Sequence, residues 1–319
     1  MIDVIIIGAG ISGLVAARDL AAEGWNVIVL EKSRSIGGRC ATRIWNGHVV
    51  DHGAQFITLH SETIRLDMLK IAQNKIHEIQ APVWDSEHKE IIATGGARYY
   101  HVEGNNRIGA ALAFGLDVRR EVEVDLLSCH NGLWRVGEMD ARCVLLTCPL
   151  PQQQKLLGLP VNHGVYLPCL TGLFEFEGSS DVALPQNYAI NLKHTGQPIE
   201  WSACENHKSG RVQPGRLVLV AQAGESFSND FLESPHEIWL AQMEESLRSL
   251  WPLSGVKTMD RWGHRWRYAR REATTDVLPM NAGCFVAGDS LVRSRIEDVW
   301  MDGQRAAKQI ADYLTAQTC

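Results

Sequence analysis

The sequence lacks paired cysteines. Its eight cysteines are scattered over 319 residues, and no two of them form a Cys-x-x-Cys pair. Zinc sites and dithiol redox centres both depend on such pairs, so we predict no metal site and disfavour a disulfide reductase. Scattered thiols are typical of reduced cysteines, which predicts a cytoplasmic protein.

Long apolar runs and an excess of basic charge are missing as well. No stretch approaches the roughly 20 apolar residues of a membrane-spanning helix, so we expect no membrane association. The first predicted strand begins at residue 2, which leaves no room for a signal peptide. The formal net charge of −6 disfavours nucleic-acid binding. With 45% hydrophobic and 21% charged residues and no visible repeat, the chain is long enough for two globular domains.

A glycine-rich loop follows the first predicted strand. In residues 3–7, Asp3 is followed by four apolar, β-branched residues, and the run leads directly into Gly8-Ala9-Gly10-Ile11-Ser12-Gly13. In a dinucleotide-binding loop, Gly8 permits the tight turn and Gly10 lets a pyrophosphate approach the backbone. Gly13 then allows close packing of helix and strand. A lone glycine triplet would equally suit an ordinary loop.

The residues after the loop favour the dinucleotide interpretation. A helix opening at Ile11 and Ser12 would offer free N–H groups and a positive dipole end to phosphate. A second apolar strand, residues 26–30, delivers Glu31, which lies 18 residues past Gly13. An acid at this distance accepts hydrogen bonds from the adenosine ribose and argues against a 2′-phosphate. The segment therefore predicts a site for FAD or NAD.

Two further segments favour FAD. Lys32 and the run Gly37-Gly38-Arg39 continue from Glu31, and a guanidinium there could bridge pyrophosphate oxygens. Near the other end, residues 284–289 form an apolar strand that ends in Gly288-Asp289. The first segment alone suits a basic surface loop, and the second an ordinary turn. Together they are similar to the two ends of a glutathione-reductase-type FAD domain.

The periodicity of the remaining chain predicts an α/β protein with a Rossmann-like domain and a second α+β domain on a mixed or antiparallel sheet. We assign residues 1–60, 104–150 and 270–319 to the FAD-binding domain, and 61–103 and 151–269 to the substrate domain. The predicted helices are 61–80, one through Ile108 and Leu112, 236–250 and 299–314. The predicted strands are 118–127, 133–136, 144–147, 172–176 and 217–223.

One segment alternates strictly between two kinds of side chain. From Arg261 to Tyr268, the even positions are Trp, His, Trp and Tyr, and the odd ones are Arg, Gly, Arg and Arg. Such alternation is typical of a strand with two unlike faces. The rings could pack in a core. They could also form an aromatic wall over a flat ligand, with His264 as its polar contact and Trp266 beside it.

Motifs along nearly the whole chain resemble one family. They are the Gly8–Gly13 loop, residues 31–39, Gly53-Ala54-Gln55-Phe56-Ile57-Thr58, residues 146–151, residues 264–269, Gly288-Asp289 and residues 295–304, with a weaker match at residues 198–208. In their order and in their residues, these motifs are similar to those of the renalase group of FAD oxidoreductases, a short branch of the flavin amine oxidase superfamily. The segments 53–58 and 264–266, and the short length, point to that branch.

The resemblance implies noncovalent FAD and adds residues to its predicted site. These are Gly53, Ala54, Gln55, Phe56, Val122 and Val299. The helix expected to begin near Val299 would direct its N-terminal dipole at the flavin, where it favours negative charge.

The resemblance also implies a substrate. In that family it is a dihydronicotinamide dinucleotide reduced at the 2- or 6-position, whose hydride passes to flavin N5, and O2 takes the electrons to form H2O2. Trp266 and Trp201 would flank the nicotinamide ring, and His264 would contact its carboxamide. Arg295 replaces a tyrosine of the amine oxidase cage and suits an anionic or carbonyl-bearing ligand, although a surface arginine at a helix entry would look the same.

Other functions stay open. An amine or amino-acid oxidase or desaturase of the same fold would share these motifs, and so would a flavin-binding protein without turnover. The segment 159–197 matches the family poorly, and the sequence does not reveal the oligomeric state.

Overall fold

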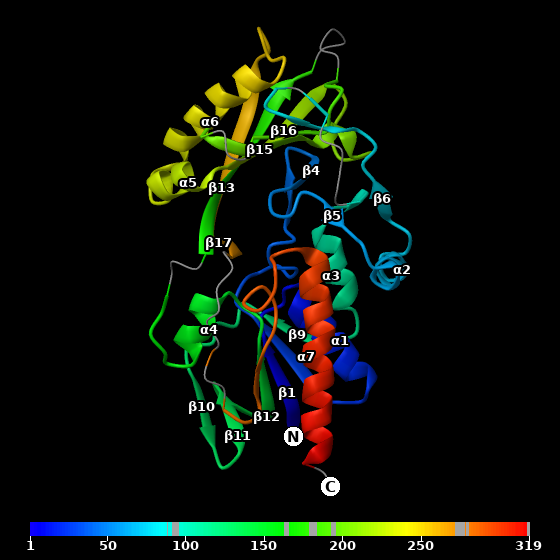
Figure 1. Ribbon diagram of the computed structural model, residues 1–319, viewed down its shortest axis with the longest axis vertical. Helices are drawn as coiled ribbons and strands as arrows, with labels where there is room; N and C mark the ends of the chain where they lie inside the picture. The colour runs from blue at the N-terminus through cyan, green and yellow to red at the C-terminus, as the bar shows by residue number, and fades with distance from the viewer. Residues whose placement is uncertain are drawn as a thin grey trace.

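The computed structural model describes residues 1–317 except 88, 91–95, 163–165, 179–183, 193–195, 272–277 and 279–280. Two lobes follow one another along the long axis, each built around its own sheet (Figure 1). Both termini lie at the outer end of the lobe that contains β1, and the other lobe contains β13, β16 and α6. The predicted α/β architecture with a Rossmann-like domain is confirmed.

The first sheet is the nucleotide-binding type. Its strand order is β10-β11-β12-β1-β2-β9, and β18 also pairs with β12. β1 is parallel to β2 and β12, as expected of buried apolar strands joined through helices. The strands are β1 (Ile2–Ile7), β2 (Val27–Glu31), β9 (Asp117–Arg120), β10 (Leu127–His130), β11 (Leu133–Val136), β12 (Met139–Leu146) and β18 (Cys284–Val286).

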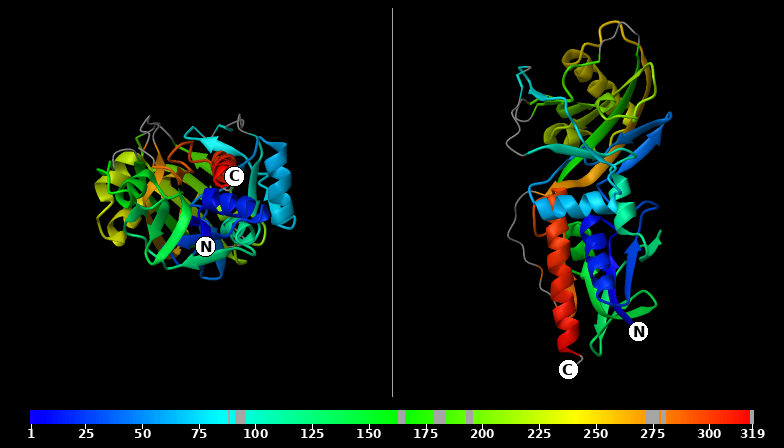
Figure 2. Two further views of the ribbon diagram at one scale, coloured as in Figure 1. Left: turned by 90° about the horizontal axis from the view of Figure 1, so that it is seen from below. Right: turned by 90° about the vertical axis from the view of Figure 1, so that its right-hand side faces the viewer.

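Helices cover this sheet. The largest core cluster joins β1 and β2 to α1, α2, α3 and α7, with Leu14, Met68 and Trp300 fully buried in it. The long C-terminal helix runs beside α1 over the length of the lobe (Figure 2). The helices are α1 (Ile11–Ala22), α2 (Glu62–Ile71), α3 (Asn106–Leu112), α4 (Leu150–Leu156) and α7 (Ile296–Ala316).

The second sheet has the order β17-β13-β16-β15-β14-β7 and is mainly antiparallel. One face packs on α6, where a Cβ on Gly263 would lie 2.3 Å from the Trp239 ring. Its elements are β7 (Val83–Asp85), β13 (Tyr166–Glu177), β14 (Ala189–Asn191), β15 (Ile199–Cys204), β16 (Arg216–Ala223), β17 (Thr258–Arg271), the short helix η2 (Glu205–His207), α5 (Glu225–Phe231) and α6 (His236–Leu250).

Two small sheets connect the lobes. A hairpin of β3 (Thr42–Trp45) and β4 (His48–Asp51) buries Trp45 and Val50 against Leu173 and Val220 of the second sheet. Beside it, β5 (Ile57–Thr58), β8 (Arg98–His101) and β6 (Ile76–Glu78) form a three-stranded sheet. Residues 51–56 therefore run between the two large sheets.

Several predicted elements need correction. The helix predicted at 61–80 ends at Ile71, because Gln73 and Asn74 adopt positive φ and the chain then enters β6. The strand predicted at 118–127 is two strands, interrupted at Glu121, where φ is +59°. Pro149 and Pro151 do end the preceding strand, but they also begin α4, since proline suits the first turn of a helix.

Other expectations are confirmed. The predicted helix 236–250 coincides with α6, and the alternating segment lies within β17.

The segment 61–103, which we assign to the substrate domain from the sequence, is divided between the lobes. Its helix α2 packs in the core of the first sheet, and its strand β7 joins the second sheet. Among the described residues, no helix is both long and apolar enough to cross a membrane.

Candidate functional site

The glycine loop has the geometry expected of a phosphate cradle. Gly8 has φ +112°, and a Cβ on Gly13 would lie 2.3 Å from the Gly8 carbonyl oxygen, so neither position accepts a side chain easily. A Cβ on Gly10, in contrast, would meet nothing within 4 Å. Gly10 is thus open on the side where α1 begins, while Gly8 and Gly13 are required by the turn itself.

Ser12 lies at the start of α1 with a buried hydroxyl. The residue is 4% exposed, and its Oγ has no hydrogen-bond partner among the described residues. A Cβ on Gly288 would lie 3.8 Å from this Oγ, so the Gly288-Asp289 turn approaches the glycine loop. An unsatisfied buried hydroxyl beside open backbone N–H groups suits a polar ligand at this point.

Glu31 ends β2 against the glycine loop. Its carboxylate accepts hydrogen bonds from the Ala9 N–H at 2.8 Å and from the Ser33 N–H at 2.8 Å. The Val122 N–H donates to the Glu31 carbonyl at 3.0 Å, which places Val122 beside the predicted adenosine site. The Lys32 side chain is exposed next to it.

Arg39 and Asp289, predicted from opposite ends of the chain, form an ion pair. Asp289 also accepts hydrogen bonds from the Tyr166 hydroxyl at 2.9 Å and the Ser294 hydroxyl at 2.8 Å. Burial would raise the pKa of Asp289, but the Arg39 guanidinium and the two hydroxyls hold it below its ordinary value. Gly38, with φ +57°, lies over Gly10, where its Cβ would be 3.3 Å from the Gly10 Cα.

A buried charge network holds the segment that leaves β4. The Lys208 ammonium lies 3.1 Å from Asp51 Oδ2 and 2.6 Å from Glu205 Oε1. The Arg211 guanidinium lies 3.0 Å from the same Asp51 oxygen, and all four side chains are fully buried. Burial raises the pKa of Asp51, and Lys208 and Arg211 bring it below its ordinary value. Two positive and two negative side chains thus compensate one another at the junction of the lobes.

Residues 53–56, which follow the Asp51 of this network, are held by neighbouring groups. A Cβ on Gly53 would lie 2.0 Å from the Arg39 carbonyl oxygen, which makes glycine obligatory there. The Gln55 side-chain amide donates to the Asp51 carbonyl, and the Asn105 amide donates to the Ala54 carbonyl at 2.9 Å. The backbone of this segment is therefore fixed from both sides.

Four rings meet where this segment approaches β17. The His52 ring stacks on Trp266 with centroids 5.5 Å apart, and it contacts His264 and Trp262 edgewise at 5.1 and 5.2 Å. The Trp266 indole N–H donates to the His52 carbonyl at 2.9 Å. Arg43 places its guanidinium 4.3 Å from the centroid of the Trp262 ring. The aromatic face predicted for β17 thus faces the nucleotide-binding lobe.

Both imidazoles of this cluster favour the neutral form. Burial and the neighbouring His264 lower the pKa of His52 to about 3. The pKa of His264 is also lowered, first by burial and then by His236 and Arg43. The Nδ1 atom of His52 is buried and has no hydrogen-bond partner among the described residues.

Trp201 lies on the same face of the second sheet but in another place. His264, Thr171, Gln222 and Trp201 occupy one row of paired positions across β17, β13, β16 and β15. Three strand spacings separate the ends of the row, about 14 Å. Trp201 instead contacts Phe56, with ring centroids 5.5 Å apart, while Gln222 donates to the Gly53 carbonyl at 3.0 Å. Residues 53–56 thus cover the middle of the row.

Arg295 precedes α7. Its guanidinium forms an ion pair with Asp298 at 2.6 Å and is 45% exposed. α7 begins at Ile296 rather than near Val299, whose N–H donates to the Arg295 carbonyl at 3.1 Å. The predicted anion contact is therefore already engaged by a carboxylate of its own helix.

Sequence reasoning missed several residues of this region: His52, Arg43, Arg98, Asp51, Glu205 and Arg211. His52 stands directly before the Gly53–Phe56 motif, which could have drawn attention to it. The others have no local signal, because their neighbours come from distant parts of the chain.

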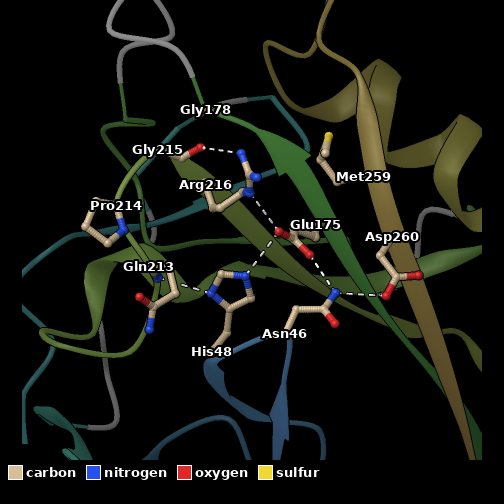
Figure 3. A pocket seen from close by; sticks show the side chains of 10 residues that line it. All are labelled: Asn46, His48, Glu175, Gly178, Gln213, Pro214, Gly215, Arg216, Met259 and Asp260. Carbon is tan, nitrogen blue, oxygen red and sulfur yellow. Dashed lines mark hydrogen bonds and ion pairs between the residues drawn. The ribbon is translucent and has the colours of Figure 1, made fainter.

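A hollow among the described residues lies elsewhere, at the tip of the β3–β4 hairpin (Figure 3). This open cavity of about 770 Å³ surrounds Glu175, whose carboxylate meets Arg216 at 2.9 Å and Asn46 at 2.7 Å. His48 lies 3.3 Å from the same carboxylate and is buried. Because these side chains compensate one another, we interpret the cavity as part of the contact between the hairpin and the second sheet. No group of three or more His, Cys, Asp or Glu suited to a metal occurs within the part of the chain that the structure describes.

The match to a known family begins in the nucleotide-binding lobe. Residues 6–70 match the family described as NAD(P)-binding Rossmann-like domain. The chain is 49% identical over 59 residues to flavin-containing amine oxidase A of Bos taurus, which covers 18% of this chain and 11% of that enzyme. The chain spans only a small share of the length of the first of these curated relatives, 9% in one and 15% in the next.

Solved structures extend the likeness to the whole fold. UDP-galactopyranose mutase in its reduced form superposes with a TM-score of 0.80 and 12% identity, covering 98% of this chain and 96% of that one. Cyclohexylamine oxidase of Brevibacterium oxydans superposes with a TM-score of 0.75 and 14% identity, covering 98% and 99%. The chain therefore has the fold of cyclohexylamine oxidase, and part of it is similar in sequence to a flavin-containing amine oxidase.

Proposed function

We propose that the protein is an FAD-dependent oxidoreductase that takes a hydride from a small planar substrate. The observation that carries this proposal is the open cradle at Gly10 and Ser12 in a chain with the fold of amine oxidases. The Ser12 hydroxyl and the α1 N-terminus would hold the pyrophosphate, and Glu31 would hold the adenosine ribose. Once bound, FAD would supply the hydride acceptor and pass the electrons to O2, giving H2O2.

The domain assignment follows the same proposal. Residues 1–60, 104–150 and 270–319 would bind the cofactor, and 61–103 and 151–269 would form the substrate side, with α2 packed on the cofactor domain. The segment 53–56 would lie against the flavin, since it is held rigidly between the two sheets. The α7 N-terminus, which includes Val299, would favour negative charge nearby.

For the substrate we propose a dihydronicotinamide dinucleotide reduced at the 2- or 6-position. Such a ring becomes aromatic as the hydride leaves, so it needs no strong general base, only a position close to the acceptor. Neutral imidazoles at positions 52 and 264 suit an uncharged ring and carboxamide. A protonated amine would meet the Arg43 charge over Trp262, which opposes its approach.

Individual residues would then position the ring. Trp266 would stack against it, with His264 donating to or accepting from its carboxamide. Trp201, at the far end of the row, would contact another part of the substrate together with Phe56. Arg295 has a smaller part than its sequence position indicates, because Asp298 already neutralises it.

An anaerobic mixing experiment tests this function. The purified, FAD-loaded protein is mixed with 6-dihydro-NAD or with a panel of amines and amino acids, and loss of flavin absorbance is followed. We expect reduction by the dihydronicotinamide and H2O2 on admission of air. In the His264→Ala variant the reduction rate should fall by about tenfold or more. Unchanged reduction in that variant would show the His264 assignment to be wrong.

The second candidate is an amine or amino-acid oxidase of the same fold. It is favoured by relatives such as the bovine amine oxidase and the putrescine oxidase of Kocuria rosea, which is 43% identical over 56 residues and matched over 12% of its length. Flavin bleaching by an amine but by no dihydronicotinamide would decide for it. Bleaching by neither class, with no H2O2 formed, would leave a flavin-binding protein without turnover.

A further inference from the structure

The Arg98 guanidinium lies over the Phe56 ring, which in turn contacts Trp201. Arg98 belongs to β8, where its backbone pairs with Thr58 and its carbonyl accepts the Ile79 N–H at 2.8 Å. Its guanidinium carbon lies 5.6 Å from the centroid of the Phe56 ring. The β8 backbone thus fixes the start of this long side chain next to the segment 53–56.

Arg98 has no carboxylate partner among the described residues. Most other half-buried and buried arginines have one: Arg39 pairs with Asp289, Arg142 with Asp3, and Arg211 with Asp51. Arg265 instead donates to the Ser234 carbonyl. Burial lowers the pKa of Arg98, which shows that water solvates the charge only in part. A partly desolvated charge without a counter-charge is available to an anionic group that reaches it.

A second hydrogen-bond donor lacks an acceptor in the same place. The Trp201 indole N–H is buried and donates to no described residue. Phe56 and Tyr188 both contact Trp201, with ring centroids 5.5 and 6.3 Å away, and the Tyr188 hydroxyl donates to the Gln55 carbonyl at 3.3 Å. A guanidinium and an indole N–H, both without acceptors beside one group of rings, suit a ligand that carries anionic oxygens.

We propose that Arg98 binds an anionic oxygen group of the substrate, a phosphate or a carboxylate, at the Phe56–Trp201 end of the aromatic face. This inference rests on the proposed function and assigns the part of the substrate that lies away from the reacting ring. The ring would contact His264 and Trp266, about 14 Å along the row. A dinucleotide carries its phosphates beyond the ribose, away from the reacting ring, whereas a small amino acid carries its carboxylate on the reacting carbon itself, so the separate position of Arg98 suits the dinucleotide better.

The test compares substrates with and without the anionic group. Arg98→Gln removes the charge, and Arg98→Lys retains it without the planar guanidinium. For 6-dihydro-NAD we expect KM to rise about 10- to 100-fold in Arg98→Gln, with partial recovery in Arg98→Lys. For 1-methyl-dihydronicotinamide, which has no phosphate, KM should stay within about twofold. An N-(carboxyalkyl)-dihydronicotinamide arm, whose carboxylate lies away from the ring, shows whether a carboxylate is bound in place of the phosphate.

Binding is measured independently of turnover. Calorimetric titration of the FAD-loaded protein with oxidised NAD should show the same loss of affinity in Arg98→Gln, and the exposed control Arg267→Gln, paired with Glu233 on the other face of β17, should match the parent. Equal KM changes for all substrates, no change at all, or an altered flavin potential without ligand would each overturn the proposal. If no dihydronicotinamide reduces the parent protein, the proposed function fails, while the titration still decides the role of Arg98.

Discussion

The protonation of His52 depends on neighbours that the chain brings from far away. Its ring is enclosed by Trp262, His264 and Trp266, all from β17, and its pKa falls to about 3. A neutral imidazole at physiological pH can accept or donate a hydrogen bond without placing a charge beside the substrate. The site therefore keeps its polarity constant over the pH range in which histidine normally titrates.

This pKa predicts a pH dependence of stability. The unfolded chain binds a proton at His52 below about pH 6.5, whereas the native protein does not until about pH 3. Stability that is fully present above pH 6.5 is thus lost as the pH falls, by about 2 kcal/mol between pH 7 and pH 5 from this residue alone. In His52→Gln, the difference in unfolding free energy between these pH values, measured with urea, should be smaller by that amount.

The exposed His130→Gln variant is the control for this measurement, and its pH dependence should follow the parent. If His52→Gln loses as much stability between pH 7 and pH 5 as the parent does, then His52 is not the neutral buried group described above.

At the scale of elements, the strand, glycine loop and helix at the N-terminus form one unit. Some of its glycines are required by the fold, and others by the proposed ligand. Gly13 is required by the fold, because its Cβ would lie 2.3 Å from the Gly8 carbonyl oxygen. Gly10 has an ordinary φ of −74° and open space around it, so the fold itself accepts alanine there. Only a pyrophosphate lying on the loop would exclude the extra methyl group.

The two alanine variants should therefore behave differently. Gly13→Ala should destabilise the FAD-free protein by about 1–3 kcal/mol. Gly10→Ala should leave its stability within about 0.5 kcal/mol and lower FAD affinity roughly tenfold or more. Thermal melts of the stripped protein and the flavin content after reconstitution measure the two effects. Full FAD binding by Gly10→Ala would argue against a pyrophosphate on this loop.

The boundaries of helices and strands show which structural features can be predicted from local sequence. The helix α6 was predicted from residue 236 to 250 because its apolar periodicity is a local feature. The end of α2 was not predicted correctly, because the turn at Gln73 and Asn74 uses positive φ in residues that are not glycine. The start of α7 was predicted one turn too late, because the polar Glu297 interrupts the apolar pattern there. In the structure the Glu297 carboxylate accepts hydrogen bonds from the His60 and Ser61 N–H groups.

In the molecule as a whole, the two lobes meet at the Asp51–Glu205–Lys208–Arg211 network. No ion in it reaches solvent, so its stability depends on exact compensation of charge. The network lies directly behind residues 53–56, which connects the rigidity of the proposed flavin-facing segment to the docking of the lobes.

Removing one charge tests this arrangement. Lys208→Met leaves two buried carboxylates with one guanidinium and should lower the unfolding free energy by about 3–5 kcal/mol. Lys75→Met, which breaks the exposed pair with Glu103, should cost less than about 1 kcal/mol. The double variant Lys208→Met/Glu205→Gln, with charge balanced again, should recover part of the loss in urea unfolding. Equal small losses in both single variants would contradict a tightly compensated network.

The sequence by itself determined the dinucleotide-binding unit, the two-sheet α/β class and the two-faced strand β17. These depend on apolar period, glycine spacing and alternation, which act between residues close in the chain. Only the tertiary structure brought Arg39 to Asp289, placed His52 among the β17 rings and separated Trp201 from Trp266 by two strands. It also placed Arg98 over Phe56, with no carboxylate partner in the part of the chain that the structure describes. The physical reason is that burial, ion pairing and pKa depend on which distant segments meet. The pattern of side chains along one strand does not specify which segments those are.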